Sequence, residues 1–415
     1  MVVLKKVYIQ FITLILFLCV SAYASQASPE KNGFFFFKDD VQDTYQKDLK
    51  DFIVDFPGIC GCEILSEDKS VFFSFESSKL FIPASLNKLI TAFSALETFG
   101  PEYRYPTKIY SDSKPTPVFG GNIYIKGFGN PVLNPQKYKD VLSYIVKTYA
   151  IKELNGDIVI DFSYFDQSQY YGKGWMWDDP QPQISALNLW LENYSIFMNK
   201  PYSLIEDMIG YYTLASLKDF GVVFNGKIKN GKIPENKTLI YTHQSEELFD
   251  IVKIMLEKSD NYIAEHIFRS IGANIYGLGS TENSVKVYEN LLFSKLGLLK
   301  KNYIIADGSG LSMYNLLSPQ LLNSLNYFMY TKYKEKYLDI LATPGEKSTI
   351  ENRFKFSTLW AKTGTLYSDS GISGIIKTKK NNLYFFTLME NNYTSSNLET
   401  KEFETKFLTL LYENY

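Results

Sequence analysis

The chain has 415 residues, of which 45% are hydrophobic and 21% charged, and its net charge is -2. This composition excludes a disordered chain and allows one large domain or two. The weak charge balance supplies no basic surface for phosphates, and the sequence contains no nucleic-acid-binding module, so we expect no nucleic-acid partner.

The N-terminal residues 1–24 have the pattern of a secretory signal peptide. Lys5 and Lys6 precede an apolar run that ends at Val20, and Ala22-Tyr23-Ala24 then forms a small-x-small cleavage pattern. A permanent membrane anchor is the alternative, but the run is short for a span of about 20 residues. We therefore expect cleavage and export to the periplasm or cell envelope. Peripheral membrane contact and the oligomeric state stay open.

The cysteines supply no disulfide framework. Cys19 lies within the leader, and the bulky Leu18 before it disfavours lipidation. Cys60 and Cys62 are two residues apart, so on a strand both point to one face, and we expect two small buried thiols. A C-x-C pair without histidine partners makes a poor metal or redox site.

The first half of the chain divides into three parts. Two β-prone runs, Ile59 to Leu65 and Val71 to Phe75, predict a hairpin. From Ser85 the apolar residues follow helical spacing until Gly100-Pro101 ends the pattern. Residues 101–244 are rich in Tyr, Pro, Gly and Asn, and their short strand-like pieces predict an insertion.

The second half begins with a helical run from Leu248 that breaks at Lys258-Ser259-Asp260-Asn261 and then resumes through Phe268. Three antiparallel strands are expected near the C-terminus, at Thr358 to Ala361, Gly374 to Thr378 and Leu383 to Met389. A final helix follows. Because an antiparallel sheet needs one buried face, we expect this helix to cover the sheet with Phe403, Phe407, Leu410 and Leu411.

A Ser-x-x-Lys motif offers the first sign of chemistry. With only His243 and His266 in the chain, a Ser-His-Asp design or a multi-histidine zinc site has almost no residues available, and we expect no metal and no cofactor. Ser85 and Lys88 lie three apart, so they share one helical face. Lys88 becomes a base if burial and a positive neighbour such as Lys362 lower its pKa.

Two further motifs follow in order. Ser259-Asp260-Asn261 interrupts an amphipathic helical run, and Lys362-Thr363-Gly364-Thr365 follows a strand-like segment. Ser66 to Lys69 and Ser395 to Asn397 also match the first two patterns, but neither has the same helical context. The ordered trio S-x-x-K, S-D-N and K-T-G is the signature of class A β-lactamases and penicillin-binding proteins.

Along nearly its whole mature length the chain resembles the class C low-molecular-mass penicillin-binding proteins, the D-alanyl-D-alanine carboxypeptidase/endopeptidase family. The resemblance rests on five stretches: Pro-Ala-Ser-Leu-Asn-Lys from Pro83, Leu-Glu-Thr-Phe-Gly-Pro from Leu96, Lys-Ser-Asp-Asn-Tyr-Ile-Ala-Glu from Lys258, Asp-Gly-Ser-Gly-Leu-Ser from Asp307 and Ala-Lys-Thr-Gly-Thr-Leu from Ala361. It implies a penicillin-sensitive hydrolase that acts on peptidoglycan stem peptides and is acylated by β-lactam antibiotics.

The resemblance also implies an α+β fold. We expect a β-lactamase/transpeptidase-like catalytic domain, with an antiparallel five-stranded sheet flanked by helices, from residues 25–100 and 245–415. Residues 101–244 are expected to form a smaller β-rich inserted domain. Relatives carry a further nested domain where this chain has only Asn193 to Ile205, so we expect that domain to be missing.

By the same resemblance, Ser85 is acylated by the penultimate D-Ala carbonyl and Lys88 takes its proton. Ser259 relays a proton to the leaving D-Ala, and Asn261 binds the substrate amide. The backbone N–H groups of Ser85 and Thr365 form the oxyanion hole.

The remaining implied roles concern substrate binding. Lys362 and Thr365 hold the terminal carboxylate, and Thr363 and Gly364 complete that binding edge, where glycine allows a close approach of the substrate backbone. Asp179, in Trp-Met-Trp-Asp-Asp, matches a position that grips the side-chain amine of the substrate in relatives.

Two positions depart from the family pattern. Many relatives have Arg where this chain has Met313, and Asp where it has Asn130. The arginine would pair with a carboxylate on the stem peptide, and methionine offers no hydrogen-bond donor. We therefore expect the chain to favour an amidated or otherwise neutral stem residue.

Two alternatives remain beside the carboxypeptidase. A serine β-lactamase shares the trio but needs an added base, such as a glutamate near Ser85 and Lys88, to hydrolyse its acyl-enzyme, and no recognisable loop supplies one. A non-catalytic peptidoglycan-binding homologue would fit Met313 and Asn130. The presence of Ser85, Lys88, Ser259, Asn261, Lys362 and Thr365 together argues against this alternative.

Overall fold

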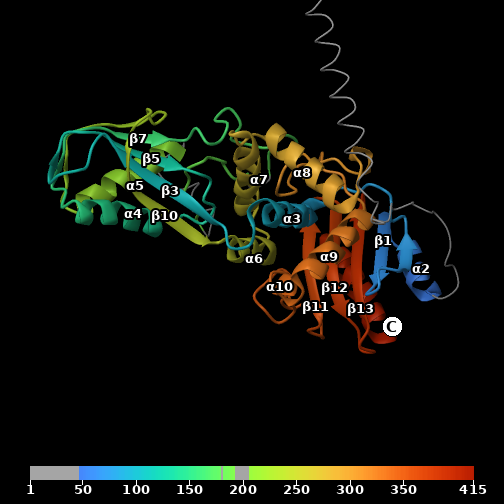
Figure 1. The fold of residues 1–415 in the computed structure, drawn as a ribbon. Helices are drawn as coiled ribbons and strands as arrows, with labels where there is room; N and C mark the ends of the chain where they lie inside the picture. Colours follow the sequence, from blue (N-terminus) through green and yellow to red (C-terminus); the bar gives the residue numbers. More distant parts are fainter. Residues whose placement is uncertain (1–45, 179–180, 192–204) are drawn as a thin grey trace, which may run out of the picture. The chain divides into compact units, whose positions relative to one another are not determined.

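One five-stranded sheet joins strands from both ends of the described chain. The computed structural model describes residues 46–178, 181–191 and 205–415. The strand order is β11-β12-β13-β1-β2, and each neighbouring pair is antiparallel (Figure 1). The bounds are Ile59–Ser66 for β1, Val71–Phe75 for β2, Leu359–Thr365 for β11, Asp369–Lys377 for β12 and Leu383–Asn391 for β13.

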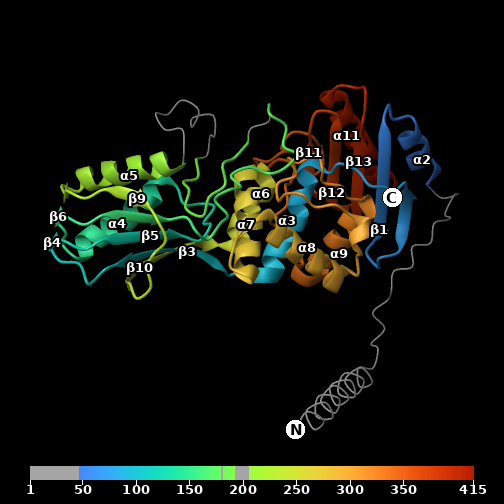
Figure 2. The same cartoon turned by 90° about the horizontal axis from the view of Figure 1, so that it is seen from above.

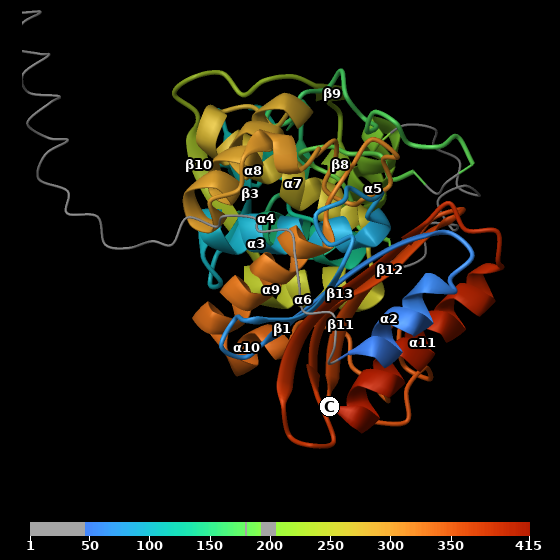
Figure 3. The ribbon, with the colours of Figure 1, turned by 90° about the vertical axis from the view of Figure 1, so that its right-hand side faces the viewer.

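Helices cover both faces of this sheet, which explains why its central strands are apolar or small almost throughout. Strands β12 and β13 each bury eight of their nine residues. One face carries α2 (Lys47–Val54) and α11 (Asn397–Asn414), as Figure 3 shows. Ile53 of α2 and Phe407 of α11 share a core with Phe386 of β13.

The opposite face packs against a layer of helices. This layer shares one core with Ile375, Phe385 and Met389 of the sheet. It consists of α3 (Asn87–Phe99), α6 (Leu248–Lys258), α7 (Asn261–Tyr276), α8 (Thr281–Leu296) and α9 (Pro319–Tyr333), with the short α10 (Glu335–Leu338) after α9. Helix α9 packs directly on β13 and β1, and α3 packs against α6, α7, α8 and α9.

The structure confirms the elements predicted for this part of the chain. The hairpin is β1 and β2, the three C-terminal strands are β11 to β13, and α6 gives way to α7 at the predicted break. Helix α11 covers the sheet, and Cys60 and Cys62 are buried free thiols that face the same core as Phe407. The expected transpeptidase-like sheet is thus present.

A second five-stranded sheet lies within residues 101–247 and is mixed. Its order is β10-β3-β5-β7-β9, with two antiparallel and two parallel pairs (Figure 2). Its strands are β3 (Arg104–Ser111), β5 (Ile123–Gly127), β7 (Ile158–Asp161), β9 (Ile228–Asn230) and β10 (Thr238–Glu247). Three two-residue strands, β4 (Val118–Phe119), β6 (Glu153–Leu154) and β8 (Val223–Phe224), form a small parallel sheet.

Two helices pack on the second sheet and were not predicted from the sequence. Helix α4 (Pro135–Thr148) begins at Asn134, whose side chain accepts a hydrogen bond from Lys137 N, and α5 (Ile205–Asp219) packs beside it. Their apolar side chains share a core with Ile125 of β5. This region has its own core, but the domain boundaries at residues 100 and 245 stay a prediction.

Several predictions concern residues outside the described ranges. They are the signal peptide at residues 1–24, Asp179, and the segment from Asn193 up to the start of α5. Within the described residues, no helix combines the length and hydropathy that a membrane span requires.

Candidate active site

Ser85 lies in a tight turn just before α3. The turn is a 3-10 helix, Ala84–Leu86, and the α-helix begins only at Asn87, two residues later than the predicted helix. Ala84 has φ 48°, a left-handed conformation that costs a non-glycine residue free energy. Ser85 therefore sits on a strained backbone that local sequence preference does not explain.

Residues distant in the sequence hold this turn. The side chain of Asn391, the last residue of β13, accepts a hydrogen bond from Ile82 N (2.7 Å) and donates one to Ile82 O (3.1 Å). The side chain of Asn87 donates to Asp307 O (2.8 Å) on the other side. The turn is thus fixed between the sheet and the loop that contains Asp307.

Lys88 is fully buried beneath Ser85. Its Nζ donates to Ser85 Oγ (2.8 Å), Asn261 Oδ1 (2.6 Å) and the backbone oxygen of Ser309 (2.6 Å). These three contacts match the three N–H donors of an ammonium group. The predicted pair Ser85 and Lys88 is therefore in direct contact, and Asn261 joins it from α7.

Burial lowers the pKa of Lys88 from its ordinary value to about 8, although the carboxylates of Asp307, Asp260 and Glu265 oppose that effect. Desolvation favours the neutral amine because an ammonium loses its hydration in a buried site. A minor fraction of Lys88 is thus already neutral near physiological pH, which is the form that a general base requires.

The break between α6 and α7 positions Ser259 and Asn261. Ser259 ends α6 in a left-handed conformation, with φ 55° and ψ 40°. Asp260 then caps α7, because its Oδ1 accepts a hydrogen bond from Ile263 N (2.9 Å). Its Oδ2 also accepts one from Trp190 Nε1 (3.1 Å).

Strand β11 contributes Lys362 from the opposite side. The side chain is fully buried, and its Nζ donates to Ser259 Oγ (2.9 Å) and Thr363 O (2.7 Å). Burial lowers the pKa of Lys362 well below its ordinary value, and the positive charges of Lys88 and Lys401 lower it further. The structure therefore brings together all five residues predicted to be catalytic, in two hydrogen-bonded groups.

The other predicted residues of β11 differ in their contacts. Strand β11 extends through the whole Lys-Thr-Gly-Thr motif, beyond the predicted end at Ala361. Thr363 is buried and donates from Oγ1 to Thr349 Oγ1 (3.0 Å). Thr365 is exposed, and its Oγ1 donates to Gly364 O (2.7 Å).

Two buried acids, Glu265 and Asp307, complete the site, and no role for either was predicted from the sequence. Glu265 Oε1 accepts hydrogen bonds from Gly308 N (3.0 Å) and Ser309 N (2.7 Å). Burial, and after it Asp307, raises the pKa of Glu265 to about 7. These hydrogen bonds orient the loop that presents Ser309 O to Lys88.

Asp307 organises the same loop. Its carboxylate accepts hydrogen bonds from Gly310 N (2.8 Å) and Ser312 N (2.7 Å) and from Trp175 Nε1 (2.8 Å). Trp175 comes from the predicted inserted region, so that region contacts the site. One signal in the sequence could have identified Glu265, namely a lone acid among the apolar residues of a helix.

The motif look-alikes have other functions in the structure. Ser66 lies at the β1–β2 turn, where its backbone pairs with Ser70. Ser396 caps α11, because its hydroxyl accepts a hydrogen bond from Glu399 N (3.2 Å). His266 is also buried, and burial lowers its pKa to about 4, so it is neutral. Among the described residues, no three His, Cys, Asp or Glu side chains are grouped to hold a metal ion.

Both departures from the family pattern lie within the described residues. Met313 follows the Asp307 loop and donates its backbone N–H to Gly174 O (3.1 Å). Asn130 is buried, and its Oδ1 accepts a hydrogen bond from Val132 N (3.1 Å).

Known proteins with similar sequences and structures share this arrangement of the chain. The D-alanyl-D-alanine carboxypeptidase DacB of Haemophilus influenzae is 24% identical over 403 residues, which cover 79% of this chain and 84% of the relative. The crystal structure of penicillin binding protein 4 (dacB) from H. influenzae superposes with a TM-score of 0.78, at 22% identity, over 88% of this chain and 99% of that one.

A more distant structure is a penicillin G-acylated predatory endopeptidase from Bdellovibrio bacteriovorus, in complex with an immunity protein. Its TM-score is 0.58, at 18% identity, over 85% of this chain and 93% of that one. The model of the D-Ala-D-Ala carboxypeptidase 3 (S13) family matches residues 46–196 and 193–412, which include every described element of the site. The chain belongs to the D-Ala-D-Ala carboxypeptidase 3 (S13) family.

Proposed function

We propose that the protein is a penicillin-sensitive serine-type D-alanyl-D-alanine carboxypeptidase, with D,D-endopeptidase activity, that acts on peptidoglycan stem peptides through an acyl-enzyme. The contacts of Lys88 support this proposal most directly. A neutral amine has two N–H groups and one lone pair. When its two N–H groups stay on Asn261 Oδ1 and Ser309 O, the lone pair faces the hydroxyl of Ser85.

Acylation then follows from this geometry. Ser85 Oγ attacks the penultimate D-Ala carbonyl and passes its proton to Lys88, while the N–H groups of Ser85 and Thr365 stabilise the oxyanion. The C–N bond breaks as Ser259 gives its proton to the leaving amine and takes one in return from Lys362, whose Nζ donates to Ser259 Oγ. Water then attacks the ester and gives a proton back to Lys362, and Ser85 Oγ leaves with the proton that Lys88 had received.

The leaving amine distinguishes the two activities. It belongs to free D-Ala in the carboxypeptidase reaction and to a neighbouring stem peptide in the endopeptidase reaction. In both cases Asn261 would bind the substrate amide, and Lys362 and Thr365 would hold the terminal carboxylate. Asp179 would grip a substrate amine.

A serine β-lactamase is less well supported. Glu265 is a buried glutamate near Lys88, but its Oε1 already accepts two backbone N–H groups, from Gly308 and Ser309. This use of the carboxyl group favours a role in loop structure over activation of water. The retained polar contacts of Ser85, Lys88 and Ser259 equally disfavour a non-catalytic homologue.

The N-terminal pattern supports export of the protein. Lys5, Lys6 and the apolar run before Ala22 are features of a secretory leader. We place the mature enzyme in the periplasm or cell envelope, where its substrate lies.

The position of Ser85 depends on two glycines. A Cβ added to Gly310, which has φ 84°, would lie 1.8 Å from Ala84 O. One added to Gly364 would lie 2.6 Å from Pro83 O and 3.1 Å from Ser85 N. Only glycine at these two positions allows the neighbouring backbones to approach the nucleophile so closely.

The first prediction tests the activity itself. Digestion of purified sacculi should release free D-Ala and convert cross-linked dimers to monomers, as read from the muropeptides, and Ser85→Ala should abolish both products. Ser66→Ala, in the other Ser-x-x-Lys match, is the control and should leave both rates unchanged. A fluorescent penicillin should label wild type lastingly. Rapid turnover of penicillin would instead favour the β-lactamase.

The second prediction concerns pH. Because acylation needs neutral Lys88, and its pKa in the free enzyme is about 8, the second-order acylation rate constant, measured well below saturating penicillin, should rise by about tenfold per pH unit below that pKa and level off above it. Stopped-flow measurements from about pH 6 to about pH 9 check this. A rate that is flat or falls across the range would exclude Lys88 as the base.

The third prediction concerns the glycine packing. Gly310→Ala should displace Ala84 and Ser85 and lower the acylation rate by about 10²-fold or more. Gly297→Ala is the matched control, because Gly297 also has positive φ, 69°, but has nothing within 4 Å of an added Cβ. Both variants should lose thermal stability, and only the first should lose reactivity per folded molecule. Equal acylation rates in the two variants would contradict the proposed role of Gly310.

The fourth prediction concerns the stem peptide. Met313→Arg introduces a cationic donor, so kcat/KM for a stem peptide with a free side-chain carboxylate should rise by about tenfold relative to its amidated form. Met313→Leu is the control and should keep the wild-type ratio. An unchanged ratio in the arginine variant would show that residue 313 does not select the stem residue.

A further inference from the structure

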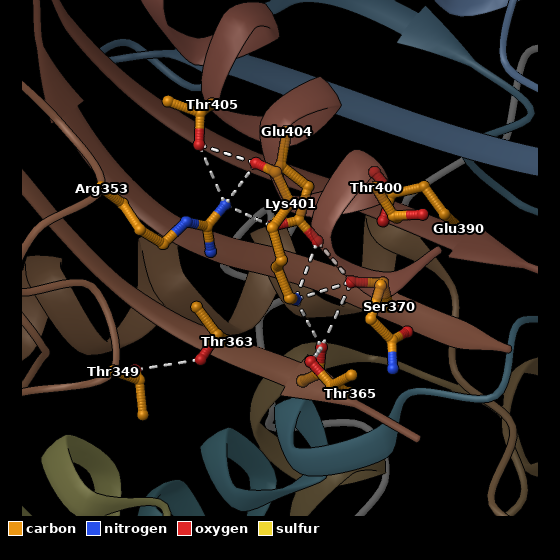
Figure 4. A network of polar contacts seen from close by, with 12 residues as sticks. Thr349, Arg353, Thr363, Thr365, Ser370, Glu390, Thr400, Lys401, Glu404 and Thr405 are labelled. Atoms are coloured by element: carbon orange, nitrogen blue, oxygen red, sulfur yellow. Dashed lines mark hydrogen bonds and ion pairs between the residues drawn. The ribbon is translucent and has the colours of Figure 1, made fainter. Parts of the chain in front are cut away.

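A partly buried charged network lies against β11 on the side of α11. Figure 4 shows Lys401 at its centre. The Nζ of Lys401 donates to Gly364 O (3.1 Å), Ser370 Oγ (2.6 Å) and Glu404 Oε1 (3.1 Å). One of the three acceptors of this ammonium group is therefore the backbone of the Lys-Thr-Gly motif.

The network holds Lys401 in place. Glu404 is fully buried, and its two oxygens accept hydrogen bonds from Ser370 Oγ (2.5 Å) and Arg353 (2.6 Å). Burial raises the pKa of Glu404, but Lys401, Arg353 and Ser370 outweigh burial and keep it below its ordinary value. A buried ion pair contributes little net stability, because desolvation offsets the attraction, so the network calls for another explanation.

The carbonyl of Gly364, which accepts a hydrogen bond from Lys401 Nζ, belongs to the peptide that carries the proposed oxyanion donor, Thr365 N–H. Gly364 C=O and Thr365 N–H share one peptide bond, and the described chain contains no cis peptide. In a trans peptide the C=O and N–H point in opposite directions. Lys401 and Ser370 lie on the carbonyl side, so the N–H of Thr365 points away from them.

The register between β11 and β12 independently shows in which direction Thr365 N–H points. Leu366 N donates to Asp369 O (2.8 Å), so the amide of Leu366 faces β12. Along an antiparallel ladder successive residues alternate between the two edges, so the amide of Thr365 faces the free edge of β11. Gly364, beside it, packs against the turn of Ser85.

We infer that Lys401 is a positioning residue for acylation, which orients and polarises the Gly364–Thr365 peptide so that Thr365 N–H is a strong oxyanion donor. The inference rests on the proposed function. A cation on the carbonyl oxygen favours the peptide resonance form with positive nitrogen, which strengthens the N–H as a donor. Thr365 Oγ1 donates to the same oxygen (2.7 Å) and adds to this effect.

Three substitutions on α11 test the inference. Lys401→Met removes the charge and the donor, Lys401→Arg keeps both, and Lys406→Met is the control on an exposed position of the same helix. Rapid-mixing kinetics with a fluorescent penicillin separate the dissociation constant of the first complex from the acylation rate constant.

We expect Lys401→Met to lower the acylation rate constant by about tenfold, less than the roughly 10²–10³-fold cost of deleting an oxyanion donor outright. The dissociation constant should change by less than about twofold, because the donor acts mainly on the transition state. Lys401→Arg should restore most of the rate, and Lys406→Met should match wild type.

A spectroscopic measurement separates donor strength from mere loss of structure. In the acyl-enzyme made with carbonyl-labelled penicillin, the infrared stretch of the ester carbonyl should move to higher frequency in Lys401→Met, because the hydrogen bond to its oxygen is weaker. A slower rate with no shift in frequency would mean a structural role and overturn the inference.

A second variant covers the possibility that Lys401→Met does not fold. The double substitution Lys401→Met with Glu404→Gln removes one positive and one negative charge together, and the same two readouts apply. If wild type is acylated and a folded variant without Lys401 matches it in rate and frequency, the inference is wrong. If wild type itself is not acylated, the proposed function fails.

Discussion

The site depends on two lysine side chains, Lys88 and Lys362, that are fully buried and lower one another's tendency to carry a charge. Removing a lysine ammonium group from water costs several kcal/mol, and a second positive charge nearby adds to that cost. The fold meets this constraint with oxygen acceptors and not with direct ion pairs. Ser309 O and Asn261 Oδ1 serve Lys88, and Thr363 O and Ser259 Oγ serve Lys362.

Because Lys88 Nζ hydrogen-bonds only to uncharged oxygen atoms among the described residues, burial remains the largest influence on its pKa. A carboxylate in direct contact with Lys88 would stabilise its charge and make the lysine a poor base. Instead, the acids Glu265 and Asp307 act one layer further out, where they bind the backbone of the loop that carries Ser309. The acids thereby shape the site while leaving the amine free to accept a proton.

The sequence predicted this arrangement where local pattern decides structure. The hairpin, the C-terminal strands and the break between α6 and α7 follow from periodicity and breaking residues. Helices α2, α4, α5, α8 and α9 were not predicted from the sequence, although Asn134 and Ser318, each followed by proline, are readable caps of α4 and α9. The mixed order of the second sheet has no local signature.

The contacts that complete the site could not be predicted from sequence alone. The left-handed conformation of Ala84 arises from packing against Gly310 and Gly364, which lie far along the chain. Likewise, the contact from Lys401 to Gly364 O exists only because α11 lies on β12 beside β11. The order of the motifs in the sequence identifies the reacting side chains. The contacts that position them depend on the order of strands and helices in the fold.

The contact between Asn391 and Ile82 joins residues 309 positions apart in sequence. Synthesis proceeds from the amino end, so Ser85 leaves the ribosome exit tunnel long before Asn391 is added to the chain. During that interval the serine lacks the sheet that fixes its backbone and the lysine of β11. We therefore expect the nascent polypeptide to be unreactive toward acyl donors until β11 and Asn391 have been made and have packed against the turn of Ser85.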